Sequence, residues 1–573
     1  MADLRLRVAA GIVSAAVTLG VAELLAAFFG ADSAPLNALG ATVIDHTPDG
    51  FREWAITTFG TSDKTALYLC MGVVTVLVAG LAGAIERTSR AAGSTLLAVF
   101  GVVATVVVVG RTSASGALPT IVGVAVGIYA LRVLTRRIDE AVEVFDQAAA
   151  RADAESSPPT VSPPSSAGVP NEIRGAATAS APAGAAERTA PADSTIDLPS
   201  TEHATPIDPV SAGRAAAAPE RRRVLQGLLV VGGLAIVTEV GGRLLGTRRR
   251  DVSGERATVE LPQPTAPEVP IAPGADLRVP GLTPYLTANE DFYRIDTALI
   301  VPQVSKNDWS LRIHGMVDRE IQLSWADLAN RPVMERLVTL ACVSNEVGGD
   351  LIGNARWLGY RLDELLAEAG PHPDADMMLS HSIDGFTAGT PLSVLTDGRD
   401  AMLAVGMNGE PLPVEHGYPA RLVVPGLYGY VSATKWVTEL EITRFDRATA
   451  YWTRRGWSAM GPIKTGTRID TPRARGRITK GRTTIAGVAW AQHRGIRTVE
   501  VQIDNGNWQP ARLADEQSID TWRQWTYDWD ATPGPHTVRA RTTDGTGTPQ
   551  TADRADVVPD GATGYPSLTI QVG

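Results

Sequence analysis

Four long apolar segments occupy the first quarter of the chain. They cover residues 8–30, 66–85, 92–110 and 117–134. About 20 apolar residues are needed to cross the hydrocarbon core of a bilayer. The run at 96–110 has no polar face at the 3.6-residue spacing of an ordinary globular helix. The pattern therefore predicts a transmembrane region of four helices within residues 1–137.

Positive charges in the short connections predict how these helices are oriented. Arginines lie at the ends that we expect to be cytoplasmic: Arg5, Arg7, Arg87, Arg90, Arg136 and Arg137. The connection at 31–65 instead carries five acidic residues against Arg52 and Lys64. Cytoplasmic loops carry the excess of Lys and Arg, so both ends of the four-helix region should lie inside the cell and this loop outside.

The pattern changes abruptly after the fourth apolar segment. Residues 138–220 are dominated by Pro, Ala, Ser and Thr, and Phe145 is their only aromatic residue. Such a composition buries too little apolar surface to offset the conformational entropy lost on folding. We expect a disordered Pro/Ala-rich linker.

A fifth apolar segment follows within residues 221–250. The arginine-rich stretch RRRVLQ at 221–226 precedes the Gly-rich apolar run 227–245. One interpretation is a fifth membrane span. The other is a twin-arginine export signal, with Val224 at the usual aromatic position, and the weak hydrophobicity of the run favours it. Either interpretation places the rest of the chain outside the cytoplasm.

Two polar regions complete the chain. Residues 275–445 contain short strand-like runs between Gly and Pro turns. Residues 471–573 alternate in the manner of strands, with Val499, Val501 and Ile503 on one face, followed by the turn 504–506. Short strands separated by Gly, Asn and Asp turns are typical of a β-sandwich.

Composition excludes several classes of protein. The 573 residues include only two cysteines, which excludes a disulfide scaffold, a zinc finger and a cysteine-held iron–sulfur cluster. A net charge of −10 gives no electrostatic reason to expect nucleic acid as a partner. None of the eight histidines lies in the four apolar segments, so the helices are poor candidates for holding haem.

Cys342 is the main chemical candidate. The apolar run at 337–341 leads to Cys342 and then to a polar turn that contains Ser344, Asn345 and Glu346. A cysteine after a strand is often only a small buried hydrophobe. Its thiolate is also a soft ligand for molybdenum, copper or zinc. No cluster of His, Cys or Asp accompanies it at metal-binding spacing, so a cofactor would have to supply the other ligands.

Several motifs in the same order as in a known family favour Cys342 as a metal ligand over a small buried hydrophobe. The segment TLACVSNEVGG (339–349), followed by NARWLGYRLDELL, resembles the molybdenum–cysteine segment of the sulfite oxidase family. The resemblance continues in NEDFYRID (289–296), MNGEPLPVEHGYPARLVVPGLYGY (407–430) and SATKWVTEL (432–440). It covers about half the chain when the C-terminal region is included.

We expect an α+β fold with three parts. The apolar segments predict an N-terminal transmembrane helical bundle, and the resemblance implies a sulfite-oxidase-like molybdopterin domain and a C-terminal immunoglobulin-like β-sandwich. In that family one molybdopterin dithiolene and one cysteine hold molybdenum, and Cys342 matches this metal ligand. The last part matches the family's dimerisation domain, which makes a homodimer an expectation.

The same resemblance implies a set of cofactor-binding residues. They are Asn289, Phe292, Tyr293, Arg294, Asn345, Ser382, His416, Arg421, Ser432, Thr434 and Lys435. Arginine and lysine suit the dianionic phosphate of the cofactor. We expect Asn345 to orient the loop of the cysteine ligand.

The chain also departs from sulfite oxidases. It reads Ser344–Val347 where those enzymes carry a further arginine, and Trp457 where they carry tyrosine. The resemblance still assigns catalytic roles to Cys342, to Arg294 as a cation for substrate or cofactor, and to Trp457 as a pocket wall. A pocket with fewer cations and an added indole favours a neutral or larger substrate than sulfite. Reduction of a sulfoxide or an N-oxide is therefore as well supported as oxidation of sulfite.

The sequence as a whole predicts a multi-pass membrane oxidoreductase with an extracytoplasmic catalytic domain. It would bind molybdenum-molybdopterin, act on a small sulfur compound or N-oxide and exchange electrons with an unidentified partner. The alternative is a surface module derived from the same family that binds cofactor or partner without turnover.

Overall fold

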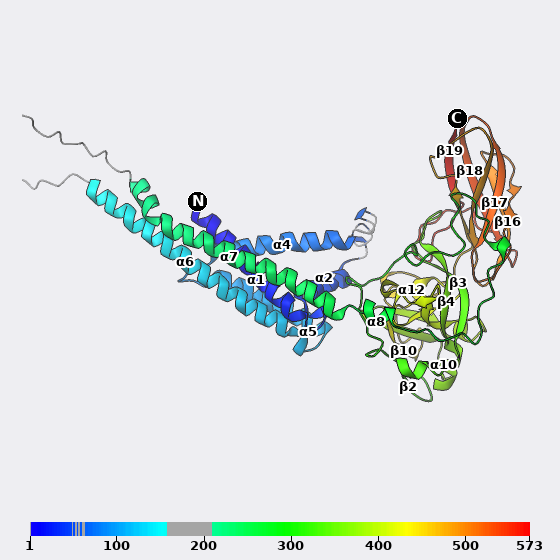
Figure 1. The fold of residues 1–573 in the computed structure, drawn as a ribbon, viewed down its shortest axis with the longest axis horizontal. Helices are drawn as coiled ribbons and strands as arrows, with labels where there is room; N and C mark the ends of the chain where they lie inside the picture. Colours follow the sequence, from blue (N-terminus) through cyan, green and yellow to red (C-terminus); the bar gives the residue numbers. More distant parts are fainter. Residues whose placement is uncertain (1, 49, 52–53, 55–57, 60–62, 157–208) are drawn as a thin grey trace, which may run out of the picture. The chain divides into compact units, whose positions relative to one another are not determined.

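The computed structural model describes residues 2–48, 50–51, 54, 58–59, 63–156 and 209–573. These residues fall into two compact units (Figure 1). The first comprises Met1–Leu39 and Leu67–Arg243. The second comprises Gly40–Ala66 and Leu244–Gly573.

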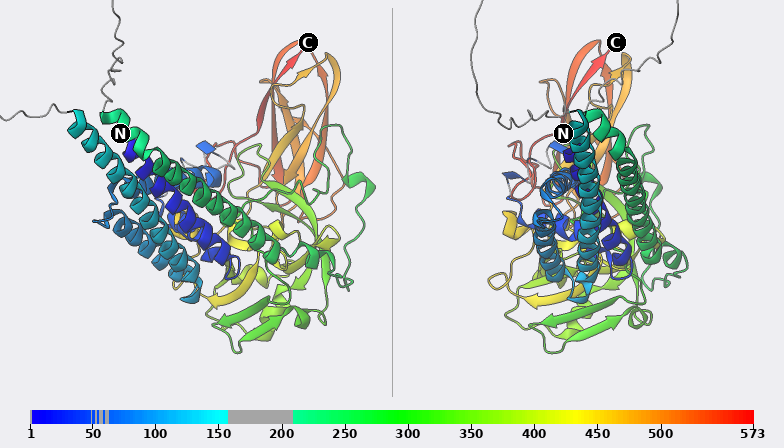
Figure 2. Two further views of the ribbon diagram at one scale, coloured as in Figure 1. Left: turned by 60° about the vertical axis from the view of Figure 1, so that its left-hand side comes forward. Right: turned by 90° about the vertical axis from the view of Figure 1, so that its left-hand side faces the viewer.

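Long helices build the first unit. They are α1 (Ala2–Ala26), α4 (Asp63–Ile85), α5 (Ala92–Arg111), α6 (Leu118–Ser156) and α7 (Pro209–Arg250). The shorter α2 (Pro35–His46) lies between α1 and α4 along the chain and belongs from Gly40 onward to the second unit, as does the first turn of α4. Each of the five long helices contains a stretch long and apolar enough to cross a membrane. Figure 2 shows α1, α6 and α7 side by side. These helices match the four predicted spans and the fifth apolar segment.

The flanks of the predicted linker differ from expectation. Helix α6 continues to Ser156 and α7 begins at Pro209, so both edges of 138–220 are helical. The reason is local composition, because 138–156 and 214–220 are rich in Ala, Glu and Arg, which are strong helix formers. Residues 157–208 of the predicted linker lie outside the described residues.

Ion pairs bring the arginine-rich connections of the first unit to one end. Arg7 pairs with Asp139 and also donates to the carbonyl oxygen of Glu86 at 3.1 Å. The hydroxyl of Thr88 donates to the same carboxylate at 2.6 Å. The first helix and the connections near 87 and 137 therefore meet at the same end. The placement of arginines in these connections predicts this arrangement.

Small residues let helices α1 and α4 approach closely. A Cβ atom on Gly83 would clash with the carbonyl oxygen of Arg7, and one on Gly11 would clash with that of Ala79. Backbone contact through small residues is a usual way of joining helices in lipid, where the hydrophobic effect between helices is weak.

Two sheets form the first part of the second unit. One has the strand order β2-β1-β10-β5-β6, and the other has the order β3-β4-β7-β8 with β9 beside β7. Their strands are β1 (Ser310–Gly315), β2 (Ile321–Ser324), β3 (Met334–Ala341), β4 (Ile352–Arg361), β5 (Met377–Ser382), β6 (Thr387–Pro391), β7 (Met402–Met407), β8 (Glu410–Pro411), β9 (Arg421–Val423) and β10 (Val437–Thr443).

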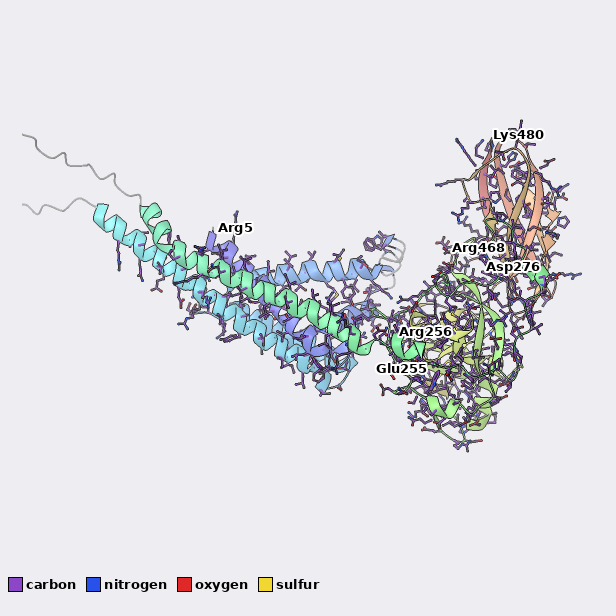
Figure 3. All side chains as sticks on the ribbon, viewed as in Figure 1. Arg5, Glu255, Arg256, Asp276, Arg468 and Lys480 are labelled. Carbon is purple, nitrogen blue, oxygen red and sulfur yellow. The ribbon has the colours of Figure 1, made fainter. Side chains whose placement is uncertain are left out.

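Helices of one to two turns surround these sheets. They are α8 (Ser253–Ala257), α9 (Trp325–Leu328), α10 (Leu362–Ala369), α11 (Leu392–Leu395) and α12 (Gly429–Ser432), with the 3₁₀ turns η5 (Val414–His416) and η6 (Thr453–Arg455). Glu255 and Arg256 of α8 (Figure 3) bond to the hydroxyl of Tyr418 at 2.6 Å and the carbonyl of Leu412 at 2.8 Å.

The sheet that contains β3 is buried on both faces. Leu337 and Leu358 pack into a core shared with the other sheet, whereas Val338, Leu340 and Trp357 pack into a second core. A strand covered on both faces reads as a continuous apolar run rather than an alternating one. This explains the unbroken apolar stretch that leads to Cys342.

Two further sheets form the C-terminal part. Their orders are β11-β13-β17-β16 and β12-β19-β18-β14-β15. The strands are β11 (Gly466–Thr471), β12 (Arg477–Ile478), β13 (Gly481–Trp490), β14 (Ile496–Ile503), β15 (Gln509–Pro510), β16 (Arg512–Leu513), β17 (Arg523–Ala531), β18 (Gly534–Asp544) and β19 (Ser567–Val572). Both sheets contribute to one apolar core, for example through Trp525 and Val538. They therefore form the expected β-sandwich, which already begins at β11.

The close contact between α1 and α4 can be tested with two glycines of the same helix. In Gly83→Ala the added methyl meets backbone of α1, so the helices must separate at a cost of about 1–3 kcal/mol. In Gly72→Ala the methyl meets open space. We expect Gly83→Ala to lower the melting temperature of the first unit in detergent and Gly72→Ala to leave it unchanged. Equal melting temperatures would contradict this packing.

Candidate functional site

Cys342 lies at the start of the connection between β3 and β4. Its backbone N–H donates to the carbonyl of Leu351 at 2.9 Å, and its own carbonyl accepts from the N–H of Asn345 at 3.1 Å. The side-chain oxygen of Asn345 accepts the N–H of Leu351, also at 2.9 Å. Asn345 therefore ties the loop on itself, and its role in orienting the cysteine ligand stays a prediction.

Cys342 is removed from water, with 8% of its surface exposed. Burial raises the pKa of its thiol, although hydrogen bonds from Ser344 oppose this shift. An uncompensated thiolate is therefore disfavoured at this position. A positive group beside the sulfur would be needed to hold the ionised form.

A residue of the C-terminal sandwich supports the cysteine loop from outside. Arg468 of β11 (Figure 3) donates to the carbonyl of Gly349 at 3.1 Å. Its guanidinium is itself held by Asp470 at 2.6 Å. The loop that presents Cys342 is thus fixed by both parts of the second unit.

Aromatic side chains pack beside the cysteine loop. Phe292 stacks on Tyr293 with ring centroids 5.3 Å apart, and meets Trp357 and His416 edge-on at 5.7 Å and 5.6 Å. A Cβ on Gly353 of β4 would lie 2.7 Å from the ring of Phe292, so glycine is needed there for the ring to fit. Burial, together with charge on the neighbouring cysteine, raises the pKa of the Tyr293 hydroxyl.

Arg421 brings a positive charge into this cluster. It is 5% exposed, and its guanidinium donates to the carbonyl oxygens of His416 at 3.2 Å and Ala433 at 3.3 Å. It also lies over the ring of Trp357 at 5.1 Å. Within the described part of the chain, no carboxylate lies at ion-pair distance from it. Desolvation lowers the pKa of Arg421 to about 10, so it remains charged at neutral pH.

Lys435 supplies a second buried cation. Its ammonium donates to Asp296 Oδ2 at 3.0 Å and to the carbonyl of Glu415 at 3.1 Å. Burial lowers its pKa to about 8, and Asp296 opposes that shift. The turn at Gly417 brings the two cations together, because its φ of +113° suits glycine and a Cβ there would crowd Arg421 and Lys435 at 3.0 and 3.2 Å.

Arg294 joins the same carboxylate from the solvent side. Its Nε donates to Asp296 Oδ2 at 2.8 Å, and 41% of its side chain is exposed. Asp296 is only 4% exposed. Although burial opposes its ionisation, Lys435 and the other neighbouring cations hold its pKa well below the usual range. Asp296 is thus an anion shared between cations.

His416 and Asn289 form the other edge of the cluster. His416 Nε2 lies 3.0 Å from the carbonyl oxygen of Asn289. Burial, reinforced by the charge of Arg421, lowers its pKa to about 4, so the ring is neutral near pH 7. A carbonyl only accepts hydrogen bonds, so Nε2 carries the proton and Nδ1 keeps a lone pair. The side chain of Asn408 donates to Asn289 at 2.8 Å and fixes it.

Three hydroxyl residues from the motifs have different surroundings. Ser432 donates to the carbonyl of Tyr428 at 3.0 Å, and Thr434 shares a hydrogen bond with Ser380 at 2.7 Å. Both hydroxyls thus have protein partners. Ser382 Oγ is buried and has no hydrogen-bond partner among the described residues. It is therefore the hydroxyl best suited to meet a ligand.

Trp457 has aromatic neighbours. Its ring lies 5.9 Å from that of Tyr430 and 6.2 Å from that of Trp452. It packs against the same core that the two sheets share. These contacts favour a packing role for Trp457, and its assignment as a pocket wall remains a prediction.

Sequence reasoning missed several members of the cluster. Asp296 lies inside a quoted motif, two residues after Arg294, and this spacing was the available signal. Trp357 also lies in a quoted motif, but nothing in the sequence pattern indicates that its ring would contact Arg421. Arg468 is far from all of these motifs along the chain, so only the fold brings it to the cysteine loop.

Comparisons with known proteins identify the family of the domain that contains Cys342. The profile of the oxidoreductase molybdopterin binding domain matches residues 298–452. Human mitochondrial sulfite oxidase is 30% identical over 289 residues, which cover 42% of this chain and 52% of the relative. The chain thus spans about half the length of the curated sulfite oxidases that it matches.

Two further relatives extend the comparison. The uncharacterised oxidoreductase YuiH of Bacillus subtilis is 33% identical over 153 residues, which cover 27% of this chain and 74% of YuiH. Among solved structures, the sulfane dehydrogenase SoxCD of Paracoccus pantotrophus is 25% identical with a TM-score of 0.45, covering 50% of this chain and 82% of the other. On the match to the domain profile and to relatives such as YuiH, the chain belongs to the sulfite oxidase family of molybdopterin-dependent oxidoreductases.

Proposed function

We propose that the chain is a membrane-anchored enzyme that binds molybdenum-molybdopterin through Cys342. It would move an oxygen atom to or from a small sulfur compound or an N-oxide on the extracytoplasmic side. The observation that carries this proposal is the buried charge of Arg421, which has backbone carbonyls but no carboxylate as partners within the described chain.

Arg421 and its surroundings fit the cofactor. A buried guanidinium without an anionic partner is costly, and a phosphate group is well matched to the geometry of its donors. Ser382 Oγ, which is buried and has no hydrogen-bond partner in the described part of the chain, would supply a further polar contact. The residues around the cysteine therefore suit a group that is anionic and rich in hydrogen-bonding atoms.

Cys342 fits the role of metal ligand on similar grounds. Desolvation opposes ionisation of the thiol, and a metal cation bonded to sulfur supplies the compensating charge. When bound, the cofactor supplies the redox chemistry and the transfer of oxygen. This chain's residues then hold the loop of Cys342 and exclude water around its sulfur.

His416 would contribute as a neutral group. Its Nδ1 lone pair can accept a hydrogen bond from an N–H group of a pterin, while Nε2 is held by Asn289. Lys435 would bind an oxyanion as a charged ammonium, and its pKa of about 8 means that this attraction weakens as the pH rises through that value.

The substrate is proposed from the cations near the site. Arg294 is the most exposed of them and is therefore the group placed to meet substrate. The curated relatives are named sulfite oxidases, and a small sulfur compound is the class that we infer for this chain. An N-oxide is the second substrate class, because the segment Ser344–Val347 provides no arginine.

The membrane arrangement is proposed from charge and hydropathy. The five long helices would cross the membrane with the arginine-rich end of the first unit inside the cell. The segment at 221–250 would serve as twin-arginine signal or as fifth span, with the second unit exported. The C-terminal sandwich would be immunoglobulin-like and would join two copies, and a separate protein would exchange electrons with the cofactor.

A substrate screen tests this function. The purified full chain, expressed with cofactor supply, would be assayed with sulfite, methionine sulfoxide and an N-oxide. We expect stoichiometric molybdenum and turnover of at least one of them. Cys342→Ser should lose at least about a hundredfold in turnover, with an unchanged circular dichroism spectrum. A wild-type chain without molybdenum would instead indicate a surface module without enzymatic activity.

Arg421→Gln separates cofactor binding from folding. The amide keeps hydrogen-bonding capacity but removes a buried charge without an anionic partner, so the cofactor-free protein should melt at the same or a higher temperature. Pterin content should fall at least about tenfold, because a charge-assisted bond to phosphate is lost. The control is Arg336→Gln, because the guanidinium of Arg336 already pairs with Asp400. This variant should keep its pterin content. Unchanged pterin content in Arg421→Gln would count against the assignment.

His416 predicts a pH dependence of stability. Its folded-state pKa of about 4 lies below the usual 6.5, so between these values the unfolded chain binds a proton that the folded chain does not. The free energy of unfolding should therefore fall by up to about 3 kcal/mol as the pH drops through this window. In His416→Asn the fall measured by chemical denaturation should be smaller. Identical slopes would show that His416 is not buried and neutral.

A further inference from the structure

The loop between the first two predicted spans contributes side chains to the second unit. Residues Gly40–Ala66 group with that unit, although their neighbours on both sides belong to the first. Asp45 near the end of α2 and Lys64 in the first turn of α4 make the contacts. Neither residue belongs to any motif of the family, since the matched region begins more than 200 residues later.

Lys64 bonds to the segment that carries Arg294. Its ammonium donates to Asp296 Oδ1 at 3.2 Å and to the carbonyl oxygens of Asp296 and Ala298. The side chain of Lys64 is 31% exposed, so it approaches Asp296 from the solvent side. It thus reaches a buried carboxylate of the candidate site.

Asp45 holds the other end of the loop. Its carboxylate accepts from the hydroxyl of Tyr451 at 3.4 Å and pairs with Arg455 at 3.6 Å. The guanidinium of Arg455 lies over the ring of Tyr451 at 3.5 Å. These partners belong to the segment that also contains Trp457.

The two contact points are connected through the turn between β5 and β6. Thr297 donates to Asp384 at 3.1 Å, and the ring of Phe386 lies 5.8 Å from that of Tyr451. Ser382, whose buried hydroxyl has no partner among the residues that the structure describes, ends the strand before this turn. The ends of the loop therefore contact a continuous arc of residues beside the candidate site.

Asp296 distributes its two oxygens between different cations. Oδ1 accepts from Lys64, whereas Oδ2 accepts from Lys435 at 3.0 Å and from Arg294 at 2.8 Å. Three cations share one carboxylate, so the cluster keeps a net positive charge. Without Lys64, Oδ1 would lose this partner and both oxygens could turn towards Lys435 and Arg294.

We propose that Lys64 is a positioning residue of the oxidoreductase site, which acts through Asp296 to keep Lys435 and Arg294 available for an oxyanion. The oxyanion is either the phosphate of the cofactor or a sulfur oxyanion substrate, which share the chemistry of bidentate oxygen acceptors. The identity of the oxyanion rests on the proposed function. The existence of an anion site that depends on Lys64 does not rest on that function.

Sulfate binding to the purified full chain tests this inference without turnover. Sodium sulfate would be titrated by calorimetry at constant ionic strength into cofactor-free wild type, Lys64→Ala and Lys64→Arg. We expect Lys64→Ala to weaken binding roughly three- to tenfold, as expected from the loss of one nearby charge. Lys64→Arg should restore most of the affinity.

Two controls separate the effect of the Lys64 charge on Asp296 from the effect of holding the loop against the second unit. Lys480→Ala removes the same charge from the distant end of the C-terminal sandwich (Figure 3) and should leave sulfate binding unchanged. Asp45→Asn loosens the loop without touching Asp296 and should change sulfate binding less than twofold, by about 0.4 kcal/mol or less. Equal weakening in Asp45→Asn and Lys64→Ala would overturn the positioning role.

The cofactor-loaded chain distinguishes the two oxyanions. If sulfate still binds and Lys64→Ala raises the KM for sulfite without lowering kcat, the site holds the substrate. If loading abolishes sulfate binding and Lys64→Ala lowers pterin content, the site holds the phosphate. Absence of sulfate binding in wild type, or equal affinity in wild type and Lys64→Ala, would refute the inference. Absence of turnover on every substrate would refute only the proposed function.

Discussion

Arg421 carries a positive charge almost out of contact with water, and backbone carbonyls and the face of Trp357 are its neighbours. Such a charge costs free energy unless an anion joins it, so the surrounding fold must hold it firmly. The left-handed turn at Gly417 and the short strand β9 do this, and they bring Lys435 beside it. The site is therefore preorganised to receive negative charge. The need to hold a buried charge explains the turn at Gly417 and the position of β9 beside it.

Cys342 and its supports lie on the same sheet as Arg421. Strands β3, β4 and β7 connect the cysteine hairpin with β9, because β7 pairs with both β4 and β9. The C-terminal sandwich stiffens this arrangement. Gln492 donates to the carbonyl of Thr339 in β3 at 3.1 Å, and Arg468 holds the cysteine loop. A region without candidate site residues thus fixes the geometry of the site.

The sequence predicted the parts of the molecule whose physics is local. Long apolar runs predicted the helices that are apolar enough to cross a membrane, alternation predicted the sandwich strands, and ordered motifs predicted that Cys342, Arg421 and Lys435 would share a domain. It could not predict Asp296 as a shared anion, because that role depends on which cations surround a folded carboxylate. Lys64 was equally out of reach, since its partner lies 232 residues away. The helical flanks of the linker were missed because composition was averaged over a long segment that contains helix formers at both edges.

The chain combines helices that are apolar enough to cross a membrane, a loop that contacts Asp296, and the buried cations Arg421 and Lys435. The central claim is that Cys342 is a molybdenum ligand. X-ray absorption at the molybdenum edge of the purified full chain tests this claim most directly, because it reports the sulfur atoms bonded to the metal. The account predicts a sulfur shell that loses one member in Cys342→Ser. A shell that is the same in both proteins would contradict it.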